Sequence, residues 1–251
     1  MPRTMIVTLL LLGVATLGGA GMSDARTYDI AVIEDIPATR AAVRILQEAY
    51  RMAGHELRPQ IVPSQRALFM AENGLVDGDL FRIEGITAEH PNLVPVPYPL
   101  MQGHVIALLA RTGNECAEQL PTGPLIAAVR RGVIIEKRAA LSLGVTPVYT
   151  GSYTQIEMLL DSGRVDLALI SEIEGISPLT GHTLNKHQKL CNPITHFTLF
   201  HYLHQRHAEL ANTLADALEQ LEASGEKGRI LNQAHEKILN ESSDGNNKTR
   251  H

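Results

Sequence analysis

The chain of 251 residues contains no tryptophan, and its aromatic residues amount to only 4%. Surfaces that stack bases or sugars need aromatic side chains, and this sequence has few aromatic residues with which to build such a surface. Positive charge is also scarce, because 22 Lys and Arg face 27 Asp and Glu and give a formal net charge of −5. A nucleic-acid binder needs a basic surface, and we therefore expect no nucleic-acid partner.

Apolar runs long enough to cross a bilayer, about 20 residues, are lacking as well. The longest run, Met5–Leu17, follows a positive charge at Arg3 and precedes small residues. This pattern is typical of a secretory signal peptide, which we predict over residues 1–25 with cleavage after Ala20 or Ala25. An uncleaved anchor is the alternative. No cysteine lies near either cleavage site, so we expect an N-terminus without lipid and a soluble, periplasmic mature protein.

Cysteine occurs only twice, at Cys116 and Cys191. In an oxidising compartment an even number of cysteines is often paired. A bridge closing a loop of this length would stabilise the fold by about 4 kcal/mol in the entropic model. Two unrelated buried thiols are the alternative. Because exported chains seldom keep free cysteine, we predict the disulfide.

The first third of the mature chain alternates strand-like and helix-like patterns. Runs rich in β-branched residues predict strands, and apolar residues at helical spacing that end at glycine predict helices. Ser64 is the expected N-cap of the second helix. The order is strand 27–33, helix 37–55, strand 56–62, helix 63–74 and strand 76–83. Such an order implies parallel strands with helical crossovers.

The same order recurs later in the chain. A strand at 123–132 is followed by a helix at 133–144, a strand at 145–151, a helix at 152–163 and a strand at 164–170. The second of these helices begins with a capping box, in which Ser152 precedes Gln155 by three residues. Two β-α-β-α-β units in one chain predict two α/β lobes.

Two similar phrases stand at the same place in both units, "ENGLVDGDL" at 72–80 and "DSGRVDLAL" at 161–169. In each phrase a glycine ends the second helix and Val-Asp opens the third strand. We therefore interpret their shared residues as structural. The functional residues are expected just beyond each phrase.

Two long strands, 101–114 and 194–203, connect the units. The first lobe is predicted at 26–107 and 196–240, and the second lobe at 108–195. A helix with Leu210, Leu214, Leu218 and Leu221 on one face follows the second connection. The polar segment 241–251 has no apolar content, and we expect it to be a disordered tail.

Four stretches give the chain a family resemblance: "VDGDLFRI", "IAAVRRG", "YTQIEMLLDSGRVDLALIS" and "LEASGEKGRILNQAHEKI". They resemble family 3 of the extracellular solute-binding proteins, which serve amino-acid-type uptake systems, and the resemblance covers about Tyr28 to Leu239. It implies an α/β, two-lobed periplasmic-binding-protein fold of type II, with lobes joined by two crossing strands at a hinge. It further implies a ligand cleft between the lobes, a monomer without cofactor, and an inner-membrane permease of the ABC transporter type or a receptor as partner.

The resemblance breaks down at the two anchors for an α-amino acid. Where the family usually has an arginine for the ligand carboxylate, this chain has His90. Where the family places an aspartate for the ligand ammonium, the chain has Ser171 followed by Glu172. We therefore expect a small polar, anionic solute, a carboxylate or an amino-acid-like compound.

Other side chains at strand ends and helix starts are expected to face the cleft. Arg82 ends the third strand of the first lobe and is the arginine that we expect to contact ligand, whereas each of the other arginines could equally form surface ion pairs. Tyr98 could cover the ligand or pack against the hinge. The ligand-binding candidates are Glu34, Asp35, Ser64, Arg66, Arg82, Tyr98, Arg130, Arg131, Ser152, Tyr153, Ser171 and Glu172.

Three other interpretations of the sequence are possible. A sensory or adaptor protein would bind the same solute and act on a membrane receptor. An enzyme similar to a cyclohexadienyl dehydratase uses this fold, but no acid–base pair has a compelling spacing, so we expect no catalytic residues. The four histidines His196, His201, His204 and His207 span a predicted strand and helix start, and we expect no metal site there.

Overall fold

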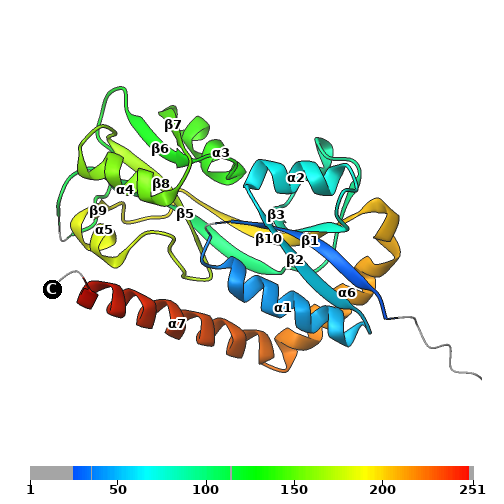
Figure 1. The fold of residues 1–251 in the computed structure, drawn as a ribbon. Coiled ribbons are helices and arrows are strands. Elements are labelled where there is room, and N and C mark those ends of the chain that lie inside the picture. Colours follow the sequence, from blue (N-terminus) through cyan, green and yellow to red (C-terminus); the bar gives the residue numbers. More distant parts are fainter. Residues whose placement is uncertain (1–24, 35, 114, 249–251) are drawn as a thin grey trace, which may run out of the picture.

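Two long strands, β5 (Met101–Leu109) and β10 (Thr195–His204), run antiparallel through the middle of a sheet of ten strands. They join two α/β lobes in this computed structural model (Figure 1), which describes residues 25–34, 36–113 and 115–248. Except for residue 25, the predicted signal peptide lies outside the described residues. The strand order is β2-β1-β3-β10-β5-β8-β6-β7. Of the two connecting strands, β10 therefore pairs with the third strand of lobe 1, and β5 pairs with the third strand of lobe 2.

Lobe 1 consists of elements from both ends of the described chain. Its strands are β1 (Thr27–Ile33), β2 (Glu56–Val62), β3 (Gly78–Ile83) and β4 (Leu93–Pro95). Its helices are α1 (Thr39–Met52), α2 (Ser64–Glu72), α6 (Ala211–Ala223) and α7 (Glu226–Lys248), with short 3-10 turns at Ile86–Ala88 and Gln205–Leu210. Strands β2, β1 and β3 are parallel, as the β-α-β-α-β pattern predicts.

Lobe 2 repeats this arrangement with β6 (Ile126–Arg130), β7 (Thr146–Thr150) and β8 (Leu167–Ile173). The strands pair in parallel, and β8 then pairs antiparallel with β5. The remaining elements are α3 (Ile134–Leu143), α4 (Tyr153–Asp161), α5 (Gly181–Lys186) and β9 (Gln188–Lys189). Helices α3 and α4 cover opposite faces of the sheet, each with its own apolar core.

The apolar stripe of α1 shows why the first helix forms where it does. Ala42, Ile45, Leu46, Ala49 and Tyr50 recur at helical spacing, and all five are 0% exposed. Burial of each large apolar side chain contributes roughly 1.5–3 kcal/mol. Helices α6 and α7 pack against α1, so the C-terminal part of the chain completes lobe 1 (Figure 1).

The two similar sequence phrases occupy equivalent joints. Gly74 and Gly163 end α2 and α4 with positive φ angles of 66° and 64°, which glycine adopts without strain. Asp77 then accepts a hydrogen bond from the backbone N–H of Asp29 on β1 at 2.8 Å. Asp166 accepts one from Ile126 on β6 at 2.7 Å. The glycine ends of both helices are as predicted, whereas Val-Asp lies just before the third strand of each unit, since β3 begins at Gly78 and β8 at Leu167.

Two local predictions require correction. Ser64 is not the N-cap of α2, because Pro63 holds that position and Ser64 is the first helical residue. The predicted disordered tail is helical over 241–248, since α7 continues to Lys248, while 249–251 lie outside the described residues. Extending an existing helix adds a hydrogen bond for each residue ordered, so a polar segment can continue a packed helix. The Ser152 cap of α4 is confirmed, with Gln155 N–H donating to Ser152 Oγ at 3.2 Å.

The predicted disulfide is confirmed. Cys116 and Cys191 are bonded and lie 75 residues apart in the chain. Next to the bridge, Ala117 and Leu190 pair as an isolated β-bridge. The disulfide thus holds the segment after β5 against the segment that leads into β10. No helix within the described residues has both the length and the apolar content needed to span a bilayer.

Candidate functional site

Two adjoining pockets lie between the lobes, and together we call them the cleft. The smaller pocket, the floor, has a volume of about 50 Å³, and the larger pocket, the mouth, about 450 Å³. Both are lined by Arg82 of lobe 1 and by Gly132, Val133 and Ile134 at the start of α3. Parallel strands of each lobe end here and helices begin here, which is the usual place for ligands in α/β sheets.

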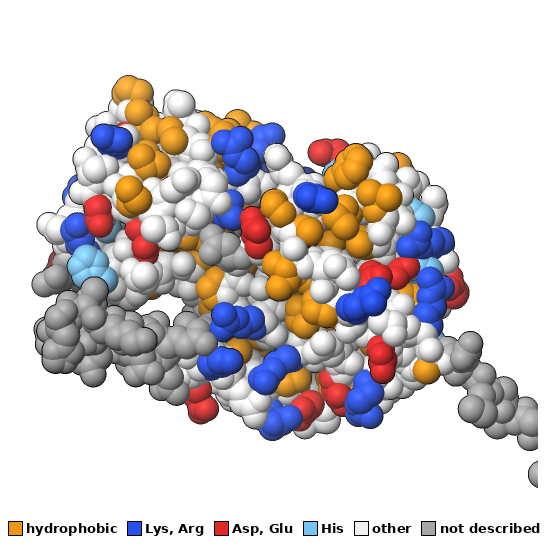
Figure 2. All heavy atoms as spheres, in the orientation of Figure 1, with side chains coloured by type: hydrophobic (Ala, Val, Ile, Leu, Met, Phe, Trp, Pro, Cys, Tyr) orange, Lys and Arg blue, Asp and Glu red, His pale blue; other side chains and the backbone are white. Residues whose placement is uncertain are grey.

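The mouth of the cleft is cationic. Arg82, Arg130, Arg131 and Lys137 line it, together with the acidic side chain of Glu89. His90, which stands where the family has its arginine, also lines the mouth. Figure 2 shows a notch between the lobes with Lys and Arg side chains beside it. The charge balance of this pocket favours an anion.

The floor of the cleft is apolar. Its wall includes Ile33, Ile36, Phe81, Ile83, Phe197 and Leu199, from lobe 1 and the connecting strands. Ile36 packs against the cores of both lobes. The polar side chains at the floor are Arg82, Tyr153 and Ser171.

Arg82 reaches the cleft as predicted, but lobe 1 also holds its guanidinium. The side chain is 5% exposed, donates from Nε to Asp79 Oδ2 at 2.8 Å, and donates from Nη1 and Nη2 to the hydroxyl and carbonyl oxygens of Ser64 at 3.0 and 2.9 Å. Burial raises the pKa of Asp79, and the adjacent Arg82 charge opposes that rise. Arg82 is therefore a positioned cation rather than a mobile one.

Ser64 connects the two lobes across the cleft. Its hydroxyl donates to the carbonyl of Gly132 at 2.9 Å. Gly132 has a φ of +83°, and a Cβ added there would lie 2.8 Å from Ser64 Cβ. Only glycine satisfies both the backbone angle and the close approach at this position.

Glu136 is a buried acid beside the floor that the sequence interpretation did not identify. It is 0% exposed, and its carboxyl accepts hydrogen bonds from Arg130 N–H at 2.7 Å and Ser171 N–H at 3.1 Å. Tyr153 Oη donates to the same carboxyl at 3.5 Å. Burial raises the pKa of Glu136 to about 7, although the two backbone donors oppose the rise. The sequence signal for its burial was its spacing, because Glu136 lies three residues before Ala139, on the same buried face of α3.

Ser171 and Glu172 project from opposite faces of β8, since consecutive strand residues alternate. Ser171 lines the floor and is 5% exposed, and its hydroxyl makes no hydrogen bond of good geometry among the described residues, although it lies close enough to Glu136 to lower the pKa of that carboxyl. Glu172 pairs instead with His104 at 3.1 Å and Lys189 at 3.2 Å on the other face. Of these two candidates, the structure brings only Ser171 into the cleft.

The remaining candidates divide between the cleft and other surfaces. Ser64, Arg130, Arg131 and Tyr153 line the cleft, and the Arg130 guanidinium lies 5.8 Å from the centre of the Tyr153 ring. Four others do not line it: Glu34 is half-buried at the end of β1, Arg66 is exposed on α2, Ser152 caps α4, and Tyr98 packs on the lobe 1 core. Asp35 lies outside the described residues.

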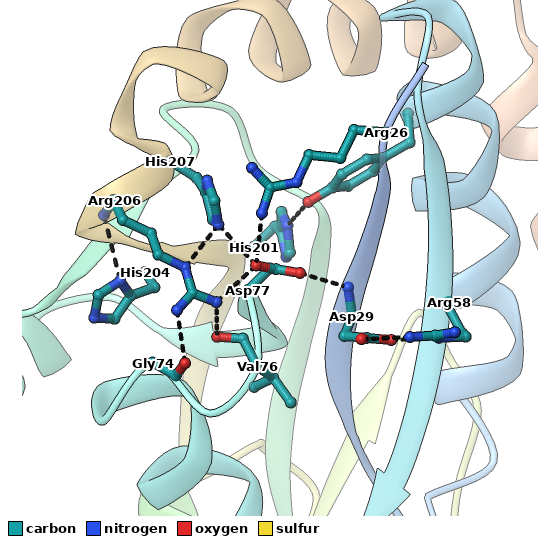
Figure 3. Close-up of polar contacts among 11 residues, drawn as sticks. Arg26, Asp29, Arg58, Gly74, Val76, Asp77, His201, His204, Arg206 and His207 are labelled. Carbon is teal, nitrogen blue, oxygen red and sulfur yellow. Dashed lines mark hydrogen bonds and ion pairs between the residues drawn. The ribbon is translucent and has the colours of Figure 1, made fainter. Parts of the chain in front are cut away.

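The four histidines of the second connection go to different places. His207 Nε2 contacts Asp77 at 2.7 Å and His204 lies beside Arg206, in a polar cluster of lobe 1 (Figure 3). His201 is fully buried between Tyr50 Oη at 2.9 Å and Asp79 O at 2.8 Å, and burial lowers its pKa to about 4. The tilted ring of His196 lies near the ring of His104 at the hinge. Among the described residues, no three His, Cys, Asp or Glu side chains are grouped as metal ligands.

No protein-family model matches the chain. An uncharacterized protein of Shewanella oneidensis is 25% identical over 202 residues, which make up 76% of this chain and 74% of that protein. The name of this relative assigns no activity.

Solved structures with the same fold are more informative. A histidine kinase sensor domain with similarity to periplasmic binding proteins has a TM-score of 0.68, with 17% identity, over 83% of this chain and 96% of its own. The GluR0 ligand-binding core of Nostoc punctiforme, in complex with L-glutamate, has a TM-score of 0.65, with 11% identity, over 82% and 98%. A putative L-cystine ABC transporter protein of Listeria monocytogenes has 0.62, with 14% identity, over 85% and 95%. The chain therefore has the two-lobed α/β fold of the type II periplasmic binding proteins, as its resemblance to family 3 of the extracellular solute-binding proteins implies.

Proposed function

We propose that this protein captures a small anionic solute reversibly in the cleft and delivers it, in the periplasm, to an inner-membrane transporter. The observation that carries the proposal is the convergence of Arg82, Arg130, Arg131 and Lys137 from both lobes on one pocket of about 450 Å³. The protein acts as a monomer without a cofactor and releases the solute unchanged.

The chemistry of the cleft suits an anion. The residues that line both mouth and floor, Arg82 and Gly132–Ile134, form the seam between the two pockets. Because Ile134 begins α3, the N-terminal backbone N–H groups and the positive end of the helix dipole lie at this seam. A lid of protein over a bound ion lowers the local dielectric, so each charge contributes more to affinity than it would in open water. The Ser64–Gly132 hydrogen bond supplies such a closing contact between lobes.

A sensory role is the second candidate, and one comparison favours it. The structure with a TM-score of 0.68 is the sensor domain of a histidine kinase. In that role the solute-loaded protein, with its cleft closed, would dock on a membrane receptor. Capture of a permease or of a receptor by the solute-loaded protein separates the two candidates.

A thermal-shift screen of carboxylates and amino acids tests solute binding. A ligand that binds only the folded state raises the melting temperature, and at 100 times its Kd it adds about 2.7 kcal/mol to the free energy of unfolding. We expect at least one small anion to raise the melting temperature in a concentration-dependent manner. Recovery of the unchanged solute after denaturation tests the absence of turnover.

Matched variants locate the binding. Removing two mouth charges in an Arg131→Ala, Lys137→Ala variant should weaken the anion by about tenfold or more, which is about 1.4 kcal/mol. Arg164→Ala removes a charge from an exposed position of the same lobe that lines neither the mouth nor the floor, and it should leave the affinity unchanged. Equal affinities of both variants, or no shift with any solute, would contradict the proposal.

A further inference from the structure

The floor and the mouth of the cleft differ in chemistry, and their shared residues mark the seam between them. The mouth presents cations, whereas the floor presents mainly isoleucine, phenylalanine and leucine side chains. A ligand that occupies both pockets therefore meets a charged end and an apolar end. A wholly polar solute would leave the apolar wall without a partner and lose the burial term.

The seam offers a polar anchor in addition to the start of α3. The Ser171 hydroxyl is buried, lines the floor and makes no hydrogen bond of good geometry among the described residues, although the Glu136 carboxyl is near enough for the hydroxyl to lower its pKa. Buried hydroxyls are nearly always bonded to protein, water or ligand. Arg82, which borders both pockets, is already ion-paired with Asp79 at 2.7 Å, so it is a fixed hydrogen-bond donor at the seam rather than an unbalanced charge. A carboxylate at the seam would satisfy the hydroxyl, while the charges of Arg130, Arg131 and Lys137 at the mouth attract it.

The carboxylates near the floor are already engaged within the protein. Asp79 is ion-paired with Arg82 at 2.7 Å and lines neither pocket, so its unpartnered Oδ1 is not presented to a ligand, and Glu136 accepts hydrogen bonds from Arg130 and Ser171 N–H groups. An ammonium group on the ligand would have to compete with these contacts, and desolvating it without a partner is costly. The seam therefore favours a carboxylate that lacks an adjacent amino group.

The size of the floor limits the apolar body. Its volume of about 50 Å³ is well below the roughly 150 Å³ of an apolar cavity that admits benzene. A branched group of three or four carbons fits this space better than an aromatic ring.

We propose that the ligand is a short, branched aliphatic monocarboxylate, with its carboxylate at Arg82 and Ser171 and its branched chain on the floor. This inference rests on the proposed function and names the class of solute. In such a complex the mouth cations supply attraction, and the floor selects the chain length.

Calorimetric titration of the exported protein with four probes, and with the dicarboxylate succinate as a fifth, tests the inference. 3-Methylbutanoate has the proposed head and body, acetate keeps the head alone, L-valine adds an ammonium group to the same body, and benzoate enlarges the body. We expect 3-methylbutanoate to bind at least about tenfold more tightly than each of the others. Acetate lacks the buried CH₂ groups, each of which contributes severalfold to affinity. L-valine brings an ammonium group that finds no partner, and benzoate is too large for the floor.

Two variant pairs assign the ends of the ligand. Ser171→Ala should weaken acetate and 3-methylbutanoate by a similar factor of about five to ten, whereas Ser162→Ala, an exposed serine of the same lobe, should change neither. Ile36→Ala enlarges the floor and should reverse the preference toward benzoate. Ile61→Ala is the control, because Ile61 is 70% exposed and lies outside the cleft.

Three outcomes would overturn the inference. Tighter binding of L-valine than of 3-methylbutanoate would show that the seam accepts an ammonium group. Equal binding of acetate would show that the floor contributes nothing. Binding of a dicarboxylate such as succinate, without binding of 3-methylbutanoate, would overturn the inference while the proposed function stands. Absence of binding by every anion and amino acid would overturn the proposed function itself.

Discussion

At the scale of single residues, Gly132 has a backbone angle and a close contact that together allow the lobes to meet at the cleft. Its φ of +83° costs an L-residue roughly 1–2 kcal/mol. A methyl group there would also push against Ser64 at 2.8 Å. Gly144 provides a natural comparison, because its φ is +68° and a Cβ there would meet nothing within 4 Å.

We predict that Gly132→Ala and Gly144→Ala lose similar backbone stability but differ in ligand affinity. Gly132→Ala should separate the lobes and weaken the best-binding solute by about tenfold. Gly144→Ala should leave that affinity at the wild-type value. Calorimetry gives the affinities, and small-angle scattering should show a larger radius of gyration for solute-loaded Gly132→Ala. Indistinguishable affinities of the two variants would show that the approach of Ser64 to Gly132 does not matter.

Glu136 makes folding stability depend on pH. Its pKa is about 7 in the folded protein, against an ordinary value of 4.5. Its contribution to the free energy of unfolding is therefore complete below pH 4.5 and is lost as the pH rises through 7. The loss is on the order of 3 kcal/mol, since one pKa unit corresponds to about 1.4 kcal/mol.

Glu136→Gln cannot titrate and should lack this loss. Urea unfolding at pH 4.5, 6 and 8 should therefore show the wild type falling relative to Glu136→Gln as the pH rises. The titration of His201, whose pKa is lowered to about 4, affects both proteins and cancels in the difference. Parallel stability curves would mean that the Glu136 carboxyl is not held in its neutral form.

At the scale of elements, the two helix-to-strand joints share a design but differ in environment. Asp77 is buried, ion-paired with Arg206 and hydrogen-bonded to His207, each at 2.7 Å, in addition to its bond to the N–H of Asp29 (Figure 3). Asp166 is exposed and bonds the equivalent backbone N–H of Ile126. The joint of lobe 1 thus carries more electrostatic stabilisation than that of lobe 2.

We predict that Asp77→Asn lowers the free energy of unfolding by about 2–3 kcal/mol, because it removes charge-assisted hydrogen bonds from a buried site. Asp166→Asn should cost less than about 1 kcal/mol, since solvent screens that site. Urea denaturation at pH 7 compares the two variants directly. An equal cost at both joints would show that the cluster around Asp77 adds nothing to the shared backbone contact.

The order of elements could be read from the sequence because each unit combines local signals that agree. Alternating β-branched runs, the apolar stripe of α1 and the helix-ending glycines all point to the same β-α-β-α-β pattern. The role of Ser64 could not be read this way. Its hydroxyl is bonded to Arg82 and Gly132, which are distant in sequence, and local propensity carries no information on such contacts.

At the scale of the whole molecule, the candidate site was only partly predictable. Of the residues predicted to bind ligand, Ser64, Arg82, Arg130, Arg131, Tyr153 and Ser171 line the cleft, and their ligand contacts stay a prediction. Glu172 was misplaced because a one-residue step along β8 changes the face of the sheet. Glu136 was missed because its hydrogen-bond partners, Arg130 and Ser171, come from strands β6 and β8 of lobe 2. The apolar wall was missed because burial between two lobes is a property of the closed fold.

The location of binding is the central claim, and amide chemical-shift mapping of the exported protein tests it most directly. The titrant is the solute that raises the melting temperature most. We predict saturable shifts that are largest for Gly132, Val133, Ile134 and Ser171, with little change around Asp77. Saturable shifts confined to another region, with these four amides unmoved, would contradict a ligand site between the lobes.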